Sequence, residues 1–210
     1  MIGTLSVQLV SAWRDTSWVE IIAAVLAVVY VLLAIRERIE CWIAAFISSC
    51  LYVWVLFGAR LYMESALNVY YAAMAAYGFW QWRRGRGGAA LPVCRWPAWR
   101  HGVALLGIVA LSVLSSYFLR RFTPAALPFA DSMVTWSSVF ATFLVARKVF
   151  ENWHWWLVID AVSSCLYLTR HLYLTMLLFC LYVVLSWVGM RQWRRSLPMG
   201  AYAADRKSVV

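Results

Sequence analysis

Two tryptophans and an aspartate have the types and spacing to bind a flat, polar or cationic ligand. Trp153, Trp156 and Asp160 stand at positions i, i+3 and i+7, so they share one face of a helix. Ser164 and Tyr167 continue this face. Indole rings stack on flat cations, and a carboxylate pairs with positive charge. A carboxylate this deep in an apolar segment costs about 2.5–3.5 kcal/mol unless it is paired or hydrated. Asp160 is therefore a candidate ligand-binding residue.

A second polar face lies upstream, within residues 61–82. Glu64, Asn68, Tyr71, Ala75 and Gly78 are separated by four, three, four and three residues, which keeps them on one side of a helix. The corresponding face of residues 171–190 reads Thr175, Phe179, Tyr182, Ser186 and Gly189. The two glycines favour close helix packing. Tryptophans near a helix end often anchor it at the membrane interface, and this alternative stays open for Trp153.

The composition places these faces in a membrane. Of 210 residues, 64% are hydrophobic and only 13% are charged, against about 25% charged in soluble domains. A soluble enzyme, a secreted disulfide scaffold and a disordered tail are excluded. Uncharged runs as long as a bilayer is thick predict an all-α integral membrane protein, because barrel strands are shorter and alternate in polarity. The seven predicted transmembrane helices span residues 18–35, 41–59, 61–82, 103–119, 129–146, 153–169 and 171–190.

The basic residues predict the orientation. Of the 19 lysines and arginines, 14 fall on the side of the C-terminus and only Arg14, Arg60, Arg120, Arg121 and Arg170 fall on the other. The positive-inside rule then places the N-terminal segment 1–17 outside, in the periplasm, and the tail 196–210 in the cytoplasm. Residues 85–102, rich in glycine and proline, are predicted to form a flexible cytoplasmic linker. The net charge of +10 reflects topology, so no nucleic-acid partner is expected.

An internal repeat organises the helices. Leu61–Arg84 aligns without gaps on Leu172–Arg195, and nine of the 24 positions match. Ser48-Ser49-Cys50-Leu51-Tyr52 also recurs as Ser163-Ser164-Cys165-Leu166-Tyr167. The pattern predicts a parallel 3+1+3 repeat, the SWEET-like arrangement, with copies at 18–84 and 129–195 and a linker helix at 103–119. In transporters, such repeats bind substrate near the midplane between the halves; duplication without that function is the alternative.

These residues carry a family resemblance. Trp153-x-x-Trp156-x-x-x-Asp160 resembles the Trp-x-x-Trp-x-x-x-Asn/Asp signature of the PnuC family of bacterial vitamin transporters, and the stretches 61–82 and 172–193 are similar to that family too. The resemblance implies a seven-helix carrier of the bacterial inner membrane, usually a homotrimer. It further implies that the carrier passes nicotinamide riboside down its gradient into the cytoplasm. Related members take thiamine or riboflavin, so the vitamin stays open.

The polar residues suit such a ligand. Nicotinamide riboside has a flat pyridinium, an amide and hydroxyls, which aromatic rings, an amide and carboxylates can contact. Thiamine is also flat and cationic and fits nearly as well. The candidate substrate-binding residues are Glu64, Asn68, Tyr71, Trp136, Trp153, Trp156, Asp160 and Tyr182.

Other functional classes lack their chemistry in this sequence. A retinal protein needs a lysine within the membrane, but Lys148 and Lys207 both fall at cytoplasmic positions. No catalytic motif is present, so an enzyme is not expected. No cofactor or metal is expected either, because the five cysteines form no Cys-x-x-Cys pair. Without a nucleotide-binding loop or a chain of carboxylates, facilitated diffusion is the predicted mechanism. A binding or structural protein remains an alternative.

Overall fold

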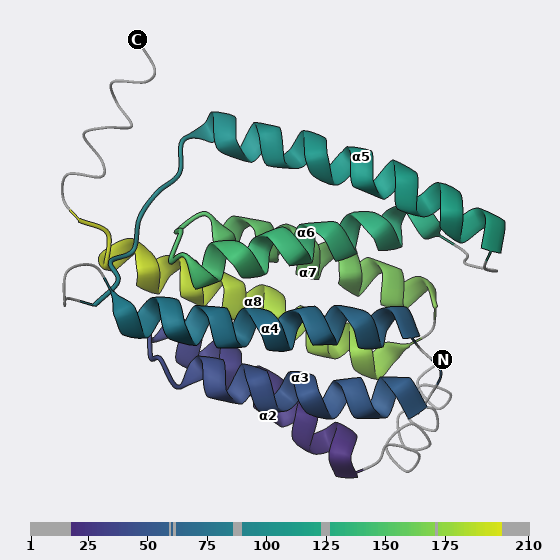
Figure 1. The fold of residues 1–210 in the computed structure, drawn as a ribbon, viewed down its shortest axis with the longest axis horizontal. Helices are drawn as coiled ribbons and strands as arrows, with labels where there is room; N and C mark the ends of the chain where they lie inside the picture. Colours follow the sequence, from purple (N-terminus) through teal and green to yellow (C-terminus); the bar gives the residue numbers. More distant parts are fainter. Residues whose placement is uncertain are drawn as a thin grey trace.

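The computed structural model describes residues 18–58, 60, 62–85, 90–122, 127–170 and 172–198, and these residues form seven helices (Figure 1). All seven predicted segments are confirmed as helices, with ends within five residues of those observed. Residues 98–102, predicted to belong to the linker, form the first turn of the helix that follows it. The predicted segment 1–17 and residues 199–210 of the predicted tail lie outside the described residues. The helices are α2 (Trp18–Ile35), α3 (Cys41–Gly58), α4 (Tyr62–Arg84), α5 (Ala98–Phe122), α6 (Pro128–Ala146), α7 (Asn152–Thr169) and α8 (Tyr173–Arg195).

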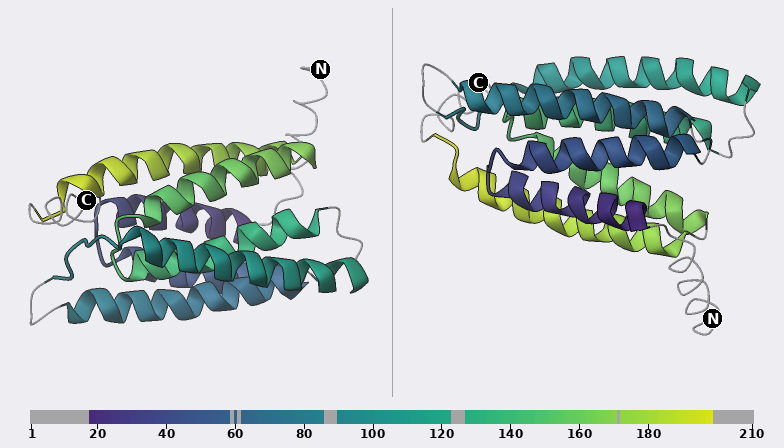
Figure 2. Two further views of the ribbon diagram at one scale, coloured as in Figure 1. Left: turned by 90° about the horizontal axis from the view of Figure 1, so that it is seen from above. Right: turned by 60° about the horizontal axis from the view of Figure 1, so that its bottom comes forward.

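Five helices are long and apolar enough to cross a membrane, namely α2, α3, α5, α6 and α8. The other two, α4 and α7, have similar lengths but carry the polar candidates, including Glu64 and Asp160. All seven run roughly side by side in one bundle (Figures 1 and 2). Many large apolar side chains, such as Leu106 and Val158, point outward and are well exposed. An apolar exterior around a packed helical interior is the pattern of a protein dissolved in lipid.

The bundle consists of two packed groups of helices and one outer helix. In the first group α3 packs against both α2 and α4, and in the second α7 packs against α6 and α8. The two groups meet where α2 contacts α8 and α4 contacts α6. The outer helix α5 packs mainly against α6, and its His101 also accepts a hydrogen bond from the indole N–H of Trp155 on α7 at 3.2 Å. Figure 1 shows α5 along the outside of the bundle.

The helices of the two groups correspond at a constant spacing in the sequence. Successive helices of the two groups end at Ile35 and Ala146, at Gly58 and Thr169, and at Arg84 and Arg195. The residue numbers in each pair differ by 111, as do those of Glu37 and Lys148 in the turns that follow α2 and α6. We call this spacing the repeat offset.

The repeat offset corrects one of the two sequence matches. It pairs Ser48 with Ile159, which lies about one helical turn before Ser163. The two Ser-Ser-Cys-Leu-Tyr stretches are therefore not at equivalent positions of the repeat, and the interpretation of them as a repeated segment was wrong. The alignment of residues 61–84 on 172–195 matches the helix ends.

Glycine allows a tryptophan to pack closely against a helix in each group. A β-carbon on Gly78 would overlap the indole of Trp42, and one on Gly189 would overlap the indole of Trp153. The two glycines are related by the repeat offset, and so are the two tryptophans. The prediction that both glycines mark close helix packing is confirmed.

We expect the substitution Gly189→Ala to destabilise the protein by about 1–3 kcal/mol, because the buried Trp153 ring cannot yield without disturbing its neighbours. Thermal unfolding in detergent, followed by tryptophan fluorescence, measures the effect. Gly107→Ala on α5 is the matched control, because a β-carbon there meets nothing within 4 Å. Equal midpoints for Gly189→Ala and Gly107→Ala would contradict the packing argument.

The connection before α5 is docked on the bundle in its described part. Leu91 and Val93 are buried. The backbone N–H of Cys94 donates to Lys148 O at 3.0 Å, and that of Phe150 donates to Cys94 O at 2.8 Å. The prediction of a flexible linker is therefore wrong for residues 90–97. Its apolar side chains bury against the bundle, and its backbone pairs with the α6–α7 turn.

Candidate functional site

Asp160 lies near the middle of α7, where the sequence predicted a binding group. It is the eighth residue after Asn152, about 12 Å along an 18-residue helix. Only 3% of Asp160 is exposed, and among the described residues it is the single buried carboxylic acid. The hydroxyl of Ser186, on α8, donates to Asp160 Oδ2 at 3.1 Å. Ser163, three residues further along α7, has a buried hydroxyl without a partner in the structure. The middle of the bundle thus holds polar groups that a ligand can pair with.

Two tyrosines, one from each group of helices, lie within electrostatic range of Asp160. Tyr71 on α4 and Tyr182 on α8 are half-buried, and the repeat offset makes them equivalent positions. Each hydroxyl lies within electrostatic range of Asp160. The Tyr182 ring meets Phe179 edge-on, with the centroids 5.8 Å apart. The structure therefore brings two candidate tyrosines, from α4 and α8, within electrostatic range of the Asp160 carboxyl group on α7.

The two tryptophans of the signature lie nearer the start of α7. Trp153 is 3% exposed and meets Trp193 edge-on, with centroids 5.4 Å apart. Its indole N–H is buried without a partner in the structure. Because an interfacial anchor would be exposed, that alternative does not hold for Trp153. Trp156 is half-buried and packs against the same apolar core.

Three other candidates are exposed or form their hydrogen bonds away from Asp160. Glu64 is exposed in the first turn of α4. The side-chain amide of Asn68 donates to the carbonyl of Glu64 at 2.9 Å, within the same helix. The indole N–H of Trp136 donates to Ser115 Oγ at 3.0 Å, which joins α6 to α5. Their roles in binding stay predictions.

The comparisons with known proteins identify the family. The family model described as "Nicotinamide mononucleotide transporter" matches residues 17–195. The chain belongs to this family. The resemblance noted from the tryptophan and aspartate signature is thereby confirmed. This membership also agrees with the several membrane-crossing helices of the fold.

Relatives of this family member differ in the compound they are named for. The nicotinamide riboside transporter PnuC of Escherichia coli (strain K12) is 24% identical over 209 residues, covering 87% of each chain. The riboflavin/roseoflavin transporter RibM of Streptomyces davaonensis is 26% identical over 183 residues, covering 84% of each. The crystal structure of the vitamin B3 transporter PnuC superposes with a TM-score of 0.71 at 21% identity, covering 93% of this chain and 89% of that one. The two structures have the same fold.

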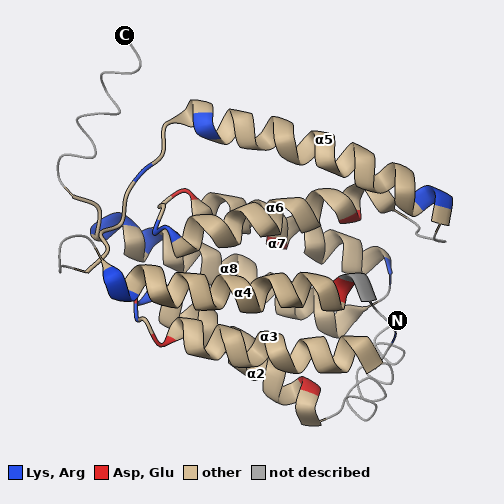
Figure 3. Ribbon diagram, in the orientation of Figure 1, with Lys and Arg blue, Asp and Glu red and all other residues tan. Residues whose placement is uncertain are grey.

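In this nicotinamide mononucleotide transporter family member, the two groups of helices are joined at the end where basic residues gather (Figure 3). Lys148 Nζ lies 2.9 Å from Glu37 Oε2, and their side chains are 7% and 22% exposed. The Lys148 ammonium also lies 4.5 Å from the centroid of the Trp82 ring. Glu37 and Lys148 are related by the repeat offset, and both adopt positive φ, 55° and 50°. Equivalent turns of the two groups thus face each other.

Two tryptophans bridge the groups reciprocally beside this ion pair. The indole N–H of Trp82 donates to Ala146 O at 3.1 Å, at the end of α6. The indole N–H of Trp193 donates to Ala34 O at 3.0 Å, at the end of α2. We call Glu37, Lys148, Trp82 and Trp193 the basic-end latch. Sequence reasoning counted Lys148 only as a topology signal and missed the latch. The repeat offset is the signal that pairs Lys148 with Glu37.

Proposed function

We propose that the protein is a vitamin transporter and that nicotinamide riboside is its substrate. The observation that carries the proposal is Asp160, a carboxyl group buried in the middle of the bundle with a hydroxyl partner and two tyrosines in range. A carboxylate and aromatic rings together suit a flat cation such as pyridinium. The names of the PnuC relatives point to the same compound.

Riboflavin is the second candidate, because the relative RibM is named for it. Its isoalloxazine ring is flat but uncharged, so a buried carboxylate offers it a hydrogen bond and no attraction between opposite charges. Asp160 therefore favours a cationic vitamin, either nicotinamide riboside or thiamine. The names of the relatives favour the first of these two.

We further propose a parallel 3+1+3 arrangement, in which α2–α4 and α6–α8 are the repeats and α5 is the linker helix. The constant repeat offset of the helix ends supports it, as do the reciprocal bonds of Trp82 and Trp193. In repeats of this kind the substrate site lies near the midplane between the halves. Asp160 has that depth within α7.

Release of the substrate at the basic end then requires the two halves to separate there. The basic-end latch holds them together through the Lys148–Glu37 ion pair and the two indole bonds. On this proposal, opening the latch lets the substrate pass from Asp160 to the basic end, and closing it prevents this passage. Rocking of one repeat against the other around a fixed site is the motion that such folds use.

The transport step is expected to be facilitated diffusion. The protein reconstituted in liposomes should equilibrate radiolabelled nicotinamide riboside across the membrane, and an imposed proton or sodium gradient should not concentrate it. Unlabelled thiamine and riboflavin, added in excess, test the two alternative substrates by competition. Uptake above the outside concentration that depends on a gradient would refute diffusion, and binding without any flux would indicate a non-transporting protein.

We propose that the basic end faces the cytoplasm of a bacterium and that the protein lies in the inner membrane as a homotrimer. The excess of arginine and lysine at that end supports the orientation (Figure 3). The trimer rests on the family resemblance. In this orientation the N-terminus lies outside and the C-terminus inside.

Cysteine labelling tests the orientation. In a background without other cysteines, Phe122→Cys at the far end of α5 should react with an impermeant thiol reagent added to whole cells, because Phe122 is 76% exposed. Cys94, exposed beside the basic end, should react only after the cells are opened. The reverse pattern would overturn the orientation.

A further inference from the structure

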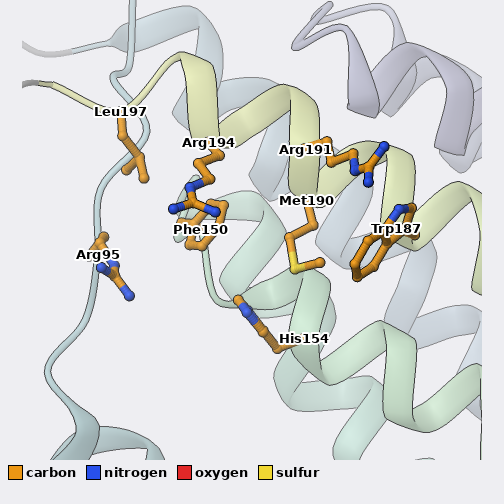
Figure 4. Close-up of a pocket in the computed structure, with 8 residues that line it drawn as sticks. All are labelled: Arg95, Phe150, His154, Trp187, Met190, Arg191, Arg194 and Leu197. Atoms are coloured by element: carbon orange, nitrogen blue, oxygen red, sulfur yellow. The ribbon is translucent and has the colours of Figure 1, made fainter.

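A basic cavity lies outside the proposed substrate site, at the basic end of the bundle (Figure 4). Its volume is about 390 Å³, and it is bounded by α8, the start of α7 and the docked connection before α5. Three arginines and a histidine contribute to its lining, namely Arg95, Arg191, Arg194 and His154. Trp187 and Met190 line it on the side towards the middle of α8. The cavity is therefore cationic at one side and apolar at the other.

Positive charge predominates around the cavity. Arg95 Nε lies 2.8 Å from Glu151 Oε1, which neutralises one guanidinium. The guanidinium of Arg191 lies 5.0 Å from the centroid of the Trp187 ring, which holds it at the wall of the cavity. Arg194 reaches in from the last turn of α8, above Phe150 (Figure 4). Guanidinium groups arranged in this way suit a phosphate, which they bind through charge-assisted hydrogen bonds.

The duplicated half of the chain does not repeat this cavity. One repeat offset earlier in the sequence, Ile43 stands for His154 and Trp80 for Arg191, and only Arg83 matches Arg194. Both halves end in Arg-Arg, and this pair already supplies positive charge that orients the last helix of each half in the membrane. Orientation therefore does not explain Arg191 and His154, whereas binding of a ligand to the second half does.

An apolar, outward-facing path leads away from the cavity. On α7, Val158 and Val162 follow His154 at intervals of four residues, and both are exposed. On α8, Val184 precedes Trp187 by three residues, and both of these are also exposed. Both rows begin at residues that line the cavity, His154 on α7 and Trp187 on α8, and the two helices pack against each other. A soluble phosphate would use only the arginines, whereas a ligand with an acyl chain would use both parts.

We propose that this cavity binds the phosphate of an anionic phospholipid, whose acyl chains lie along the exposed rows of α7 and α8. The cavity stands where the apolar exterior gives way to arginine, which is the level of the headgroups in a bilayer. A zwitterionic lipid offers the same chains but no net charge, so the arginines select the anionic headgroup. This site is independent of the substrate site at Asp160.

Native mass spectrometry of the protein in a mild detergent tests the proposal, with dioleoyl phosphatidylglycerol and dioleoyl phosphatidylcholine as probes. We expect the unmodified protein to bind phosphatidylglycerol more tightly than phosphatidylcholine. The double variant Arg191→Gln/Arg194→Gln should bind phosphatidylglycerol about tenfold more weakly or worse, since each basic group near a membrane surface contributes roughly fivefold. Its binding of phosphatidylcholine should weaken much less, because the choline cation already offsets the charge of that phosphate.

The matched control is Arg83→Gln, which removes the exposed arginine equivalent to Arg194 from the first half. It should bind phosphatidylglycerol like the parent. If the double variant unfolds in detergent, Arg191→Gln alone should still weaken binding severalfold.

Unchanged binding in the Arg191 variants, or an equal loss in Arg83→Gln, would overturn the proposal. Full displacement of the lipid by equimolar glycerol 3-phosphate would assign the cavity to a soluble phosphate instead. Loss of an oligomer in the double variant without added lipid would assign it to an interface between copies.

Discussion

Asp160→Ala should weaken binding of nicotinamide riboside by about 10- to 100-fold, which is the cost of removing a charged hydrogen-bonding partner from a buried site. The substitution leaves the Ser186 hydroxyl without its acceptor and removes the negative charge near Tyr71 and Tyr182. Isothermal titration calorimetry on the purified protein measures the loss. Uptake into liposomes should fall with it.

Asp160→Asn separates charge from shape. The amide oxygen can still accept the Ser186 hydrogen bond, and the family signature that this chain resembles accepts asparagine here. We expect a severalfold loss with Asn and a severe one with Ala. Asp131→Asn is the control, because that carboxylate is paired with Arg170 at 2.7 Å at the far end of the bundle. If the folded Asp160→Ala protein binds and transports like the parent, Asp160 is not a substrate-binding residue.

Reversing either charge of the basic-end latch should lower stability sharply, and reversing both should restore most of it. Glu37→Lys places two ammonium groups side by side, and Lys148→Glu places two carboxylates there. Breaking a buried ion pair costs about 3–5 kcal/mol, and the 22% exposure of Glu37 places this pair at the low end. The thermal unfolding midpoint in detergent should therefore fall in each single variant.

The double variant Glu37→Lys/Lys148→Glu exchanges the two charges between equivalent positions of the repeat. Lys148 lies over Trp82, and the repeat offset relates Trp82 to Trp193. A lysine at position 37 should therefore lie over Trp193 and face a glutamate at position 148. Both the unfolding midpoint and uptake should recover towards the parent. A double variant no better than the worse single variant would show that the pair does not join the halves.

The sequence by itself determined the helices and the family. The length of an apolar run is set by the thickness of a bilayer, so all seven helices could be predicted from the apolar runs in the sequence. The polar ends were not predictable in this way: α5 begins five residues before its predicted start, and α8 ends five residues after its predicted end. The tryptophan and aspartate signature is a local pattern within α7, and the family match confirmed it. The burial of Asp160 was also predictable, because a carboxylate in an apolar segment has few alternatives to a polar partner inside the bundle.

Only the tertiary structure decided which residues meet. Helical periodicity assigns a residue to a face, but the rotation and depth of the facing helix determine its partner. Asn68 and Tyr71 share a predicted face, yet the Asn68 amide bonds within α4, whereas Tyr71 comes within electrostatic range of Asp160. Ser186 is the partner of Asp160 because α8 packs against α7 with these two residues at the same level of the bundle. The Lys148–Glu37 pair likewise joins residues far apart in the sequence, which meet because equivalent turns of the two groups of helices face each other.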